Sequence, residues 1–393
     1  MQIFYTSIDA EINYEELLDR VNQRKFFYRS YLAHDYLDFI TNLICGLIQH
    51  QDIVLIDYTG ISHFQNSEPI DFGVSIATVN DLISQIVHSR SAVGIYSSGS
   101  EGPPKLVFQT IERLMLSVKI EAKYQTSSWG FTYNPTHSAG IQMFLQVIAN
   151  KSCLVDLHKI TRQTIIKLIQ SKNLTYLSAT PTFYRMLAPY NFEAPSVKSV
   201  TLNGEKSTLP LILNVKKVFP NARIRNIYGS TEVGPLMSSE TDVFKIPERL
   251  AGKIKIEDGE LIFHESIVSK SVATQKWYPS GDLVEIVCDD PLQIKFVSRK
   301  SRILNVAGHN VNPQNVEEVI LELPGIVDAR VTGKENALIG NLLVAEVQVI
   351  PDFNISEKTL MNQLKTLLPA YKVPRIITFV NSTQIGRTGK KLI

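Results

Sequence analysis

Apolar positions along the chain alternate between the spacings expected of helices and of strands. Tyr14–Asn22 and Tyr36–Ile48 repeat apolar residues every three or four positions, which predicts two amphipathic helices. Ile53–Asp57 is a short apolar run that ends in turn residues, and Val93–Tyr96 is a second run that leads into glycines. Both runs are predicted strands. The alternation predicts an α/β core with βαβ construction.

The same alternation continues into the middle of the chain. Thr164–Gln170 has the spacing of an amphipathic helix, and Leu174–Leu177 is apolar enough for a strand. Thr182–Leu187 is expected to begin a helix directly after Pro181. An α/β core explains this order of elements most simply.

From Ala251 onward the pattern changes twice. Short strands separated by Asp-Gly or Asp-Asp-Pro turns predict a β-rich subdomain. These strands are expected at Leu261–Phe263, Leu283–Val287 and Gln293–Val297. After Arg299, helices and strands alternate again, which predicts a small α+β domain. Its helices are expected at Pro313–Leu323 and Glu357–Leu368, and its strands at Ala329–Val331, Leu342–Val349 and Ile376–Val380.

Composition and charge limit the classes of protein. The chain has 393 residues, of which 44% are hydrophobic and 20% charged, so it can bury a sizeable core. Its net charge of +2 is too small to steer nucleic acid or an anionic membrane toward it, so neither is an expected partner. The N-terminus shows no basic region followed by an apolar stretch, and the apolar windows are too short to span a bilayer. Three widely spaced cysteines, Cys45, Cys153 and Cys288, argue against a disulfide framework or a zinc site. We therefore expect a cytoplasmic protein.

The segment from Tyr96 to Lys105, YSSGSEGPPK, is a candidate phosphate-binding loop directly after a predicted strand. Glycines let the backbone approach phosphate oxygens, serine hydroxyls donate hydrogen bonds, and the lysine supplies positive charge. The candidate ligands are Ser97, Ser98, Gly99, Ser100, Gly102 and Lys105. The loop is not the GxxxxGK[ST] motif, because two prolines precede the lysine and Leu106 follows it. An ordinary surface turn remains the alternative.

Two further segments contain residues suited to a nucleotide. In Asn226–Glu232, the Tyr228 ring suits stacking on a flat base, Thr231 is a donor for phosphate, and Glu232 is a ligand for Mg²⁺. In Trp277–Leu283, Asp282 follows a glycine at an expected strand start, where its carboxylate can accept from both ribose hydroxyls. The alternative for each segment is a turn with a solvated acid.

The order of five segments resembles the superfamily of adenylate-forming enzymes over nearly the whole chain. That superfamily comprises acyl- and aryl-CoA synthetases, nonribosomal peptide adenylation domains and firefly luciferase. Its motifs are a Ser/Thr/Gly-rich loop ending in Pro-Lys, YGxTE, GD, a GRxD hinge and a terminal GK. The matching segments here are Tyr96–Lys105, Tyr228–Glu232, Gly281–Asp282, Ser298–Ser301 and Gly389–Lys390. Secondary matches are Pro135–Gly140 to PxxHxxG, Asn203–Glu205 to a GGE-type adenine loop, and Tyr371–Pro374 to YKVP.

The resemblance implies a two-step reaction. A carboxylate attacks the α-phosphate of Mg·ATP to form acyl-AMP and pyrophosphate, and the thiol of coenzyme A or of a carrier protein's phosphopantetheine then displaces AMP. It further implies a large α/β domain over residues 1–300 and a small, mobile C-terminal domain over residues 301–393 that rotates about a hinge at Ser301. By the resemblance, Lys390 contacts the carboxylate and the α-phosphate, Glu232 binds Mg²⁺, and Gly308 lines the thiol tunnel. Asp282 and Arg299 contact the ribose. The residues implied at the adenosine end are Asn226, Tyr228, Gly229, Gly204 and Glu205.

Several positions depart from the family pattern. Glu101 stands where the phosphate loop usually has Ser or Thr, Ser298 replaces the hinge glycine, and Ser301 replaces the usual Asp or Lys. The YxEL-like helix at Tyr14–Leu17 lies so near the start that the first subdomain must be shortened. Because of these departures, the alternative interpretation is a catalytically degenerate homologue that acts as a binding or scaffold protein. An unrelated nucleotide-binding protein would require five ordered motifs to coincide.

The sequence restricts the acid without identifying it. Amino-acid-activating relatives place an Asp near Thr132–Asn134, and no acidic residue lies between Ser127 and Gly140. An α-amino acid is therefore disfavoured, and an aryl or fatty acid is expected. His137 borders the acyl site or is a packed structural residue. The thiol acceptor, coenzyme A or an acyl carrier protein, is left open.

Replacing Lys390 tests the role that the resemblance assigns to the terminal lysine. Lys390→Ala should reduce acyl-AMP synthesis by about 10²–10³-fold, because it removes a positive charge at developing negative charge. Thioester formation from supplied acyl-AMP should survive. Lys391→Ala is the matched control, since it removes the same charge one residue away. Equal rates of ATP–pyrophosphate exchange in the two variants would contradict the assignment.

Overall fold

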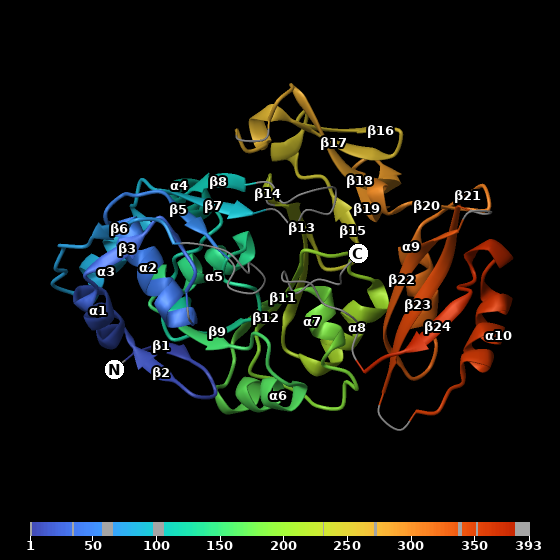
Figure 1. The fold of residues 1–393 in the computed structure, drawn as a ribbon, viewed down its shortest axis with the longest axis horizontal. Coiled ribbons are helices and arrows are strands. Elements are labelled where there is room, and N and C mark those ends of the chain that lie inside the picture. Colours follow the sequence, from blue (N-terminus) through green and yellow to red (C-terminus); the bar gives the residue numbers. More distant parts are fainter. Residues whose placement is uncertain are drawn as a thin grey trace.

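The computed structural model describes residues 2–33, 35–56, 66–96, 106–230, 232–270, 273–336, 340–350 and 353–381. Figure 1 shows a large body, coloured blue to yellow, with a smaller orange-to-red domain beside it. The expected class, α/β with a β-rich subdomain and a small α+β C-terminal domain, is confirmed. No helix among the described residues is both long and apolar enough to cross a membrane.

An eight-stranded sheet forms the centre of the large body. Its order is β14-β13-β12-β11-β9-β10-β1-β2, with parallel pairing between all neighbours except at the two ends. The strands are β1 (Ile3–Thr6), β2 (Glu11–Asn13), β9 (Ser128–Phe131), β10 (Cys153–Asp156), β11 (Tyr176–Ala179), β12 (Ser199–Asn203), β13 (Arg223–Ser230) and β14 (Gly234–Ser239). Because the carboxyl ends of parallel strands share one edge, the residues that follow β11, β12 and β13 lie together, where open α/β sheets bind ligands.

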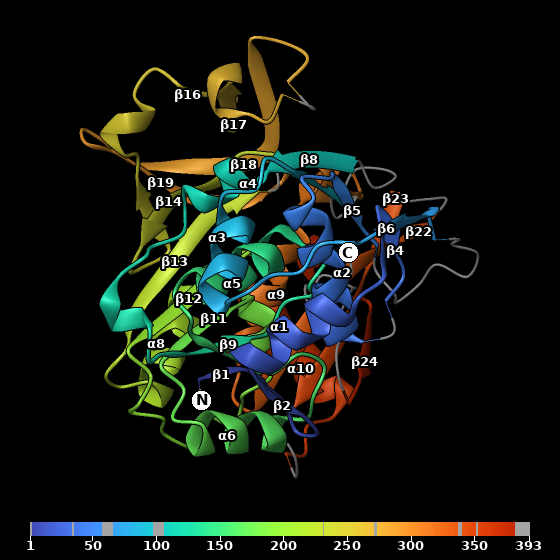
Figure 2. The same cartoon turned by 90° about the vertical axis from the view of Figure 1, so that its left-hand side faces the viewer.

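Helices connect and cover these strands. The helices of the large body are α1 (Tyr14–Gln23), α2 (Tyr36–Ile48), α3 (Val79–Val87), α4 (Ile111–Met115), α5 (Ser138–Ala149), α6 (Arg162–Ser171), α7 (Pro181–Arg185) and α8 (Leu209–Val218). Figure 2 shows α1, α2, α3 and α5 gathered in one layer. Helix α1 begins at a capping box, in which the Asn13 side chain accepts the N–H of Glu16 and the Glu16 carboxylate accepts the N–H of Asn13.

Two small sheets belong to the N-terminal part. One contains β4 (Ser30–Tyr31), β5 (Ile53–Leu55), β7 (Ala92–Tyr96) and β8 (Leu106–Thr110). The other pairs β3 (Phe26–Tyr28) with β6 (Pro69–Asp71). The buried strands β5 and β7 pair in parallel. The predicted strand at Val93–Tyr96 is thus confirmed, and the one at Ile53–Asp57 is confirmed as far as Leu55, while Asp57 lies outside the described residues.

The β-rich subdomain is a five-stranded antiparallel sheet in the order β15-β19-β18-β17-β16. Its strands are β15 (Val243–Lys245), β16 (Ile254–Glu257), β17 (Glu260–His264), β18 (Trp277–Asp289) and β19 (Leu292–Arg299). A short turn of 3₁₀ helix at Lys300–Arg302 leads from β19 into the small domain.

The small domain has its own buried core, which includes Val316, Ile320 and Ala329. Its elements are β20 (Leu304–Val306), β21 (His309–Val311), α9 (Pro313–Leu321), β22 (Ile326–Asn336), β23 (Gly340–Val349), α10 (Glu357–Leu367) and β24 (Ile376–Phe379). Both helices and all three expected strands of this domain are confirmed, with the strands longer or shifted at their ends.

Two local predictions are wrong. The segment Asn226–Glu232 is expected to follow a strand, but Asn226–Ser230 forms the end of β13, because it pairs with β14 across a bulge at Tyr228 and Gly229. Asp282 does not start a strand but lies inside the long β18, paired with Arg299 of β19. In both places, pairing with a neighbouring strand overrides the turn chemistry of glycine and serine.

Gly140→Ala should destabilise the large body. Gly140 lies in the first turn of α5, and a Cβ there would stand 2.5 Å from the carbonyl oxygen of Asn134 and 3.0 Å from the Cα of Pro135. Because backbone must shift, we expect a loss of about 1–3 kcal/mol and a lower midpoint of urea unfolding. Gly73→Ala is the control, since its Cβ would meet nothing within 4 Å. Equal midpoints would refute the close contact.

Candidate active site

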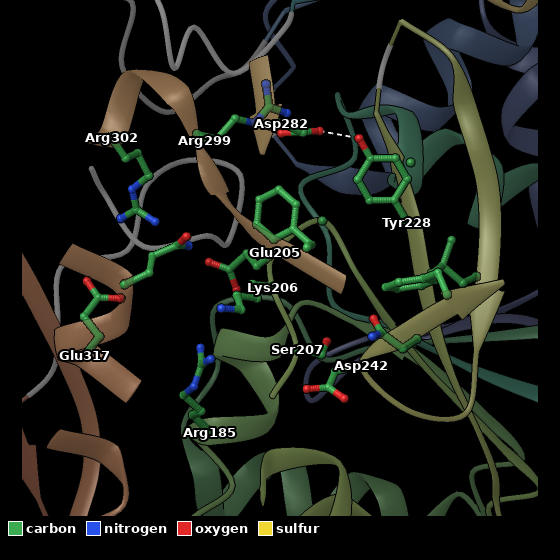
Figure 3. Close-up of a pocket in the computed structure, with 17 residues that line it drawn as sticks. Arg185, Glu205, Lys206, Ser207, Tyr228, Asp242, Asp282, Arg299, Arg302 and Glu317 are labelled. Carbon is green, nitrogen blue, oxygen red and sulfur yellow. Dashed lines mark hydrogen bonds and ion pairs between the residues drawn. The ribbon is translucent and has the colours of Figure 1, made fainter. Parts of the chain in front are cut away.

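A pocket lies where the carboxyl ends of β12 and β13 meet the β-rich subdomain and the small domain (Figure 3). It contains about 1130 Å³ of empty space, a figure that includes the solvent at its open mouth. Ten predicted site residues lie in the described part of the chain, and seven of them line this pocket. The seven are Gly204, Glu205, Asn226, Tyr228, Gly229, Asp282 and Arg299.

The Asp282 carboxylate is the most constrained group in the pocket. It is 4% exposed and accepts a hydrogen bond from the Tyr228 hydroxyl. The Arg299 Nε lies 2.5 Å from Asp282 Oδ1, and Arg299 Nη1 donates to the Ser280 carbonyl at 3.2 Å. Burial, together with the charge of Asp282, raises the pKa of the Tyr228 phenol well above 10.0, so this hydroxyl remains a donor. The arrangement holds the Asp282 carboxylate, a hydrogen-bond acceptor, in a fixed orientation.

Aromatic rings form an apolar wall beside this carboxylate. The centre of the Tyr228 ring lies 6.2 Å from that of Phe244 and 6.4 Å from that of Phe296, and all three residues line the pocket. Such a wall suits the flat face of a base. No motif marks Phe244 or Phe296. They reach the pocket because β15 and β19 pair with each other next to β18.

The loop after β12 is held from two sides. Gly204 has a φ of +89°, which favours glycine. The Glu205 carboxylate accepts the N–H of Thr182 at 2.9 Å, which ties the loop to the first turn of α7. The Lys206 Nζ donates to the Val297 carbonyl of β19 at 3.3 Å. Glu205 thus has a structural bond at the pocket in addition to the adenine contact that the resemblance implies.

The small domain completes the pocket with three residues that sequence patterns did not single out. Arg302, Gln314 and Glu317 line it, and Figure 3 shows Arg302 and Glu317 across from Tyr228. The Glu317 carboxylate accepts the N–H of Val331 at 2.9 Å. Only Arg302 had a sequence signal, since it adjoins the hinge motif. The others required the placement of α9.

Three described residues of the predicted set lie outside the pocket. His137 is half-buried at the N-cap of α5. Glu232 is half-buried, and its carbonyl accepts the N–H of Ser269 at 2.7 Å. Gly308 is exposed in the turn between β20 and β21, with φ of +84° following Ala307 at +50°. A tight turn with positive φ favours glycine, so the backbone conformation by itself accounts for a glycine at position 308.

The remaining predicted residues fall outside the described part of the chain. They are Ser97, Ser98, Gly99, Ser100, Gly102, Lys105, Thr231 and Lys390. Among the described residues there is no group of three or more His, Cys, Asp or Glu side chains that could hold a metal. A single carboxylate such as Glu232 still fits Mg²⁺, because this ion usually takes one or two carboxylates and completes its shell with phosphates and water.

Comparisons with known proteins agree with this geometry. The family profile described as AMP-binding enzyme matches residues 49–256, and the profile described as AMP-binding enzyme C-terminal domain matches residues 315–390. The mitochondrial acyl-coenzyme A synthetase ACSM2 of Rattus norvegicus is 24% identical over 78% of this chain, which spans 61% of that protein. The 2-succinylbenzoate–CoA ligase of Listeria monocytogenes is 23% identical over 81% of this chain and 73% of its own length.

Solved structures share the fold. ATP-bound MatB from Rhodopseudomonas palustris superposes with a TM-score of 0.69 at 14% identity, covering 99% of this chain and 94% of the other. The o-succinylbenzoate coenzyme A synthetase MenE from Bacillus subtilis, in complex with ATP and magnesium ion, gives a TM-score of 0.68 at 17% identity over 99% and 95%. At these identities the likeness concerns the fold alone.

Asp282→Asn should weaken binding of AMP and ATP about 10- to 100-fold, because a neutral amide replaces a charged acceptor. Isothermal titration in the absence of any acid measures this directly. Asp242→Asn is the control: Asp242 also lines the pocket, but its carboxylate pairs with Lys295 at 2.9 Å. Comparable losses of affinity in both variants would show that Asp282 has no particular role in nucleotide binding.

Proposed function

The chain belongs to the AMP-binding enzyme family, and from this membership we propose that it is an acid–thiol ligase that uses ATP. Residues 1–300 would form the nucleotide-binding domain, and residues 301–393 the small domain with the catalytic lysine. The separate core of the small domain supports this division, as does the short 3₁₀ turn at Lys300–Arg302 between the domains.

The observation that supports the proposal most directly is the convergence of Tyr228, Asp282 and Arg299 in one pocket. These residues come from three separate motifs, and each has chemistry for one part of adenosine. The ring of Tyr228 suits the base, and the carboxylate of Asp282 suits the two ribose hydroxyls. Arg299 holds that carboxylate in place through the ion pair.

In the first half-reaction, an oxygen of the substrate carboxylate forms a bond to the α-phosphorus of ATP, and the bond from that phosphorus to pyrophosphate breaks. Catalysis of this step depends mainly on positioning and on neutralising charge. The pocket residues hold the adenosine end, while Lys390, Thr231 and the loop of Ser97–Lys105 are proposed to act at the phosphates. Mg²⁺ bound with Glu232 would neutralise phosphate oxygens.

In the second half-reaction, a thiol sulfur bonds to the acyl carbon and AMP leaves. We propose coenzyme A as the acceptor, because the curated relatives are named as coenzyme A ligases and synthetases. An acyl carrier protein is the other acceptor considered. The acid is proposed to be aromatic or fatty, since no acidic residue lies between Ser127 and Gly140. A relative from Oryza sativa is named 4-coumarate–CoA ligase-like 5.

The testing experiment is a panel of aryl, fatty and amino acids with ATP and Mg²⁺. Acyl-AMP is scored first, by pyrophosphate release, and thioester is scored second, with coenzyme A or a holo carrier protein. Acyl-AMP from an aryl or fatty acid supports the proposal. ATP binding without acyl-AMP from any acid would instead support the degenerate homologue.

Glu232→Gln should reduce acyl-AMP formation by about 10²-fold or more at fixed Mg²⁺, because the neutral side chain loses the charge that holds the ion. Raising the Mg²⁺ concentration should recover part of the rate. Glu240→Gln is the control, since the Glu240 carboxylate pairs with Arg223 on the surface. A normal rate for Glu232→Gln would exclude Glu232 from the metal site.

A further inference from the structure

Helix α9 of the small domain forms one wall of the pocket. Gln314 and Glu317 lie three positions apart, on one face of α9, and both line the pocket. Figure 3 shows Glu317 on the opposite side of the pocket from Tyr228. The pocket is therefore complete only when α9 lies where it does here.

Lys206 joins the loop after β12 to this helix. Its ammonium lies 2.6 Å from the carboxylate of Glu318, and the Lys206 side chain is only 10% exposed. The same ammonium donates to the Val297 carbonyl at 3.3 Å. Lys206 itself lines the pocket, directly after Gly204 and Glu205, so Glu318 is the member of the pair that tests positioning without direct contact. The ion pair thus connects the nucleotide-facing loop of the large domain with the small domain.

A second contact spans the hinge segment. The Ser298 hydroxyl donates to Asn312 Oδ1 at 3.1 Å, and both residues are buried. Asn312 is the N-cap of α9, where the same oxygen accepts the N–H of Gln314 at 3.0 Å. The serine that replaces the family glycine therefore helps to place the first turn of α9.

The pocket also contains buried polar atoms that have no partner within the described residues. Gln314 Oε1 and Ser207 Oγ each lack a hydrogen bond there, and both residues line the pocket. A buried polar atom without a partner is costly. A ligand with donor and acceptor groups would satisfy these atoms.

We propose that Lys206 and Glu318 are a positioning pair that makes α9 a wall of the nucleotide pocket, with Gln314 as the α9 side chain that contacts the nucleotide. This inference rests on the proposed function, because it presumes that the pocket binds ATP or AMP. Nucleotide binding and domain placement are then coupled. The factor by which the nucleotide favours the observed placement of α9 equals the factor by which that placement, stabilised by the ion pair, raises nucleotide affinity.

The experiment measures ATP and AMP affinity by isothermal titration without any acid, so that no turnover occurs. Lys206→Met and Glu318→Gln should each weaken binding about 3- to 30-fold. The double variant should bind no more weakly than Lys206→Met, since both changes remove one interaction. Lys206→Glu combined with Glu318→Lys should recover affinity. Gln314→Ala should weaken binding about 3- to 10-fold while leaving the ion pair intact.

Hydrogen exchange of α9 supplies a readout independent of affinity. AMP should slow exchange in Pro313–Leu321 of the wild-type chain and have a smaller effect in Glu318→Gln. Glu318 does not line the pocket, so this variant separates positioning from direct contact. A purely structural pair would change exchange equally with and without AMP, which would contradict the proposal.

The matched control is the ion pair of Arg330 with Glu346 inside the small domain. Its atoms are 3.1 Å apart, and its side chains are 14% and 28% exposed, compared with 10% and 32% for Lys206 and Glu318. Arg330→Met should leave nucleotide affinity within about twofold. If the wild-type chain binds neither ATP nor AMP, the proposed function is wrong. Wild-type binding with unchanged affinity in both Lys206→Met and Glu318→Gln overturns this inference alone.

Discussion

The site is organised around one buried carboxylate. Ionised Asp282 would be costly in its buried position unless it were paired, and its partners come from different parts of the fold. Tyr228 is on the central sheet, whereas Arg299 is on β19 of the β-rich sheet. Satisfying Asp282 therefore fixes the two sheets relative to each other. The pocket with its aromatic wall lies at this junction.

The small domain adds a second level of organisation. Its contacts with the large body include polar ones, such as the pair of Lys206 with Glu318 and the bond of Ser298 to Asn312. A third is the buried pair of Arg185 with Asp328 at 3.9 Å. Interfaces between domains of one chain usually allow relative motion, which suits a domain expected to rotate. The observed placement of α9 is thus stabilised by a few specific contacts.

Sequence patterns predicted several of the elements, and α2 was predicted with its observed bounds. They did not predict α3, although its apolar residues have helical spacing, nor α4, α5 or α8. Helix α5 is buried on nearly all sides, so its apolar residues show no stripe. Helix α8 exposes Leu209 and Leu213, which blurs its polar face. Glycine and serine around Tyr228 and Asp282 suggested turns, because sequence alone does not reveal strand partners.

The order and chemistry of the motifs were sufficient to identify the candidate nucleotide-binding residues. Glycine conformation, carboxylate charge and aromatic rings are local properties that the sequence shows directly. Five of the seven that meet in one pocket lie on or after β12 and β13, which end at a common edge of the central sheet, and Asp282 and Arg299 reach it from the β-rich sheet. Only the tertiary structure decided that Phe244, Phe296, Lys206 and Gln314 join them. Their positions depend on pairing and domain contacts between residues far apart in the chain. Those contacts leave no spacing in the sequence from which they could be predicted.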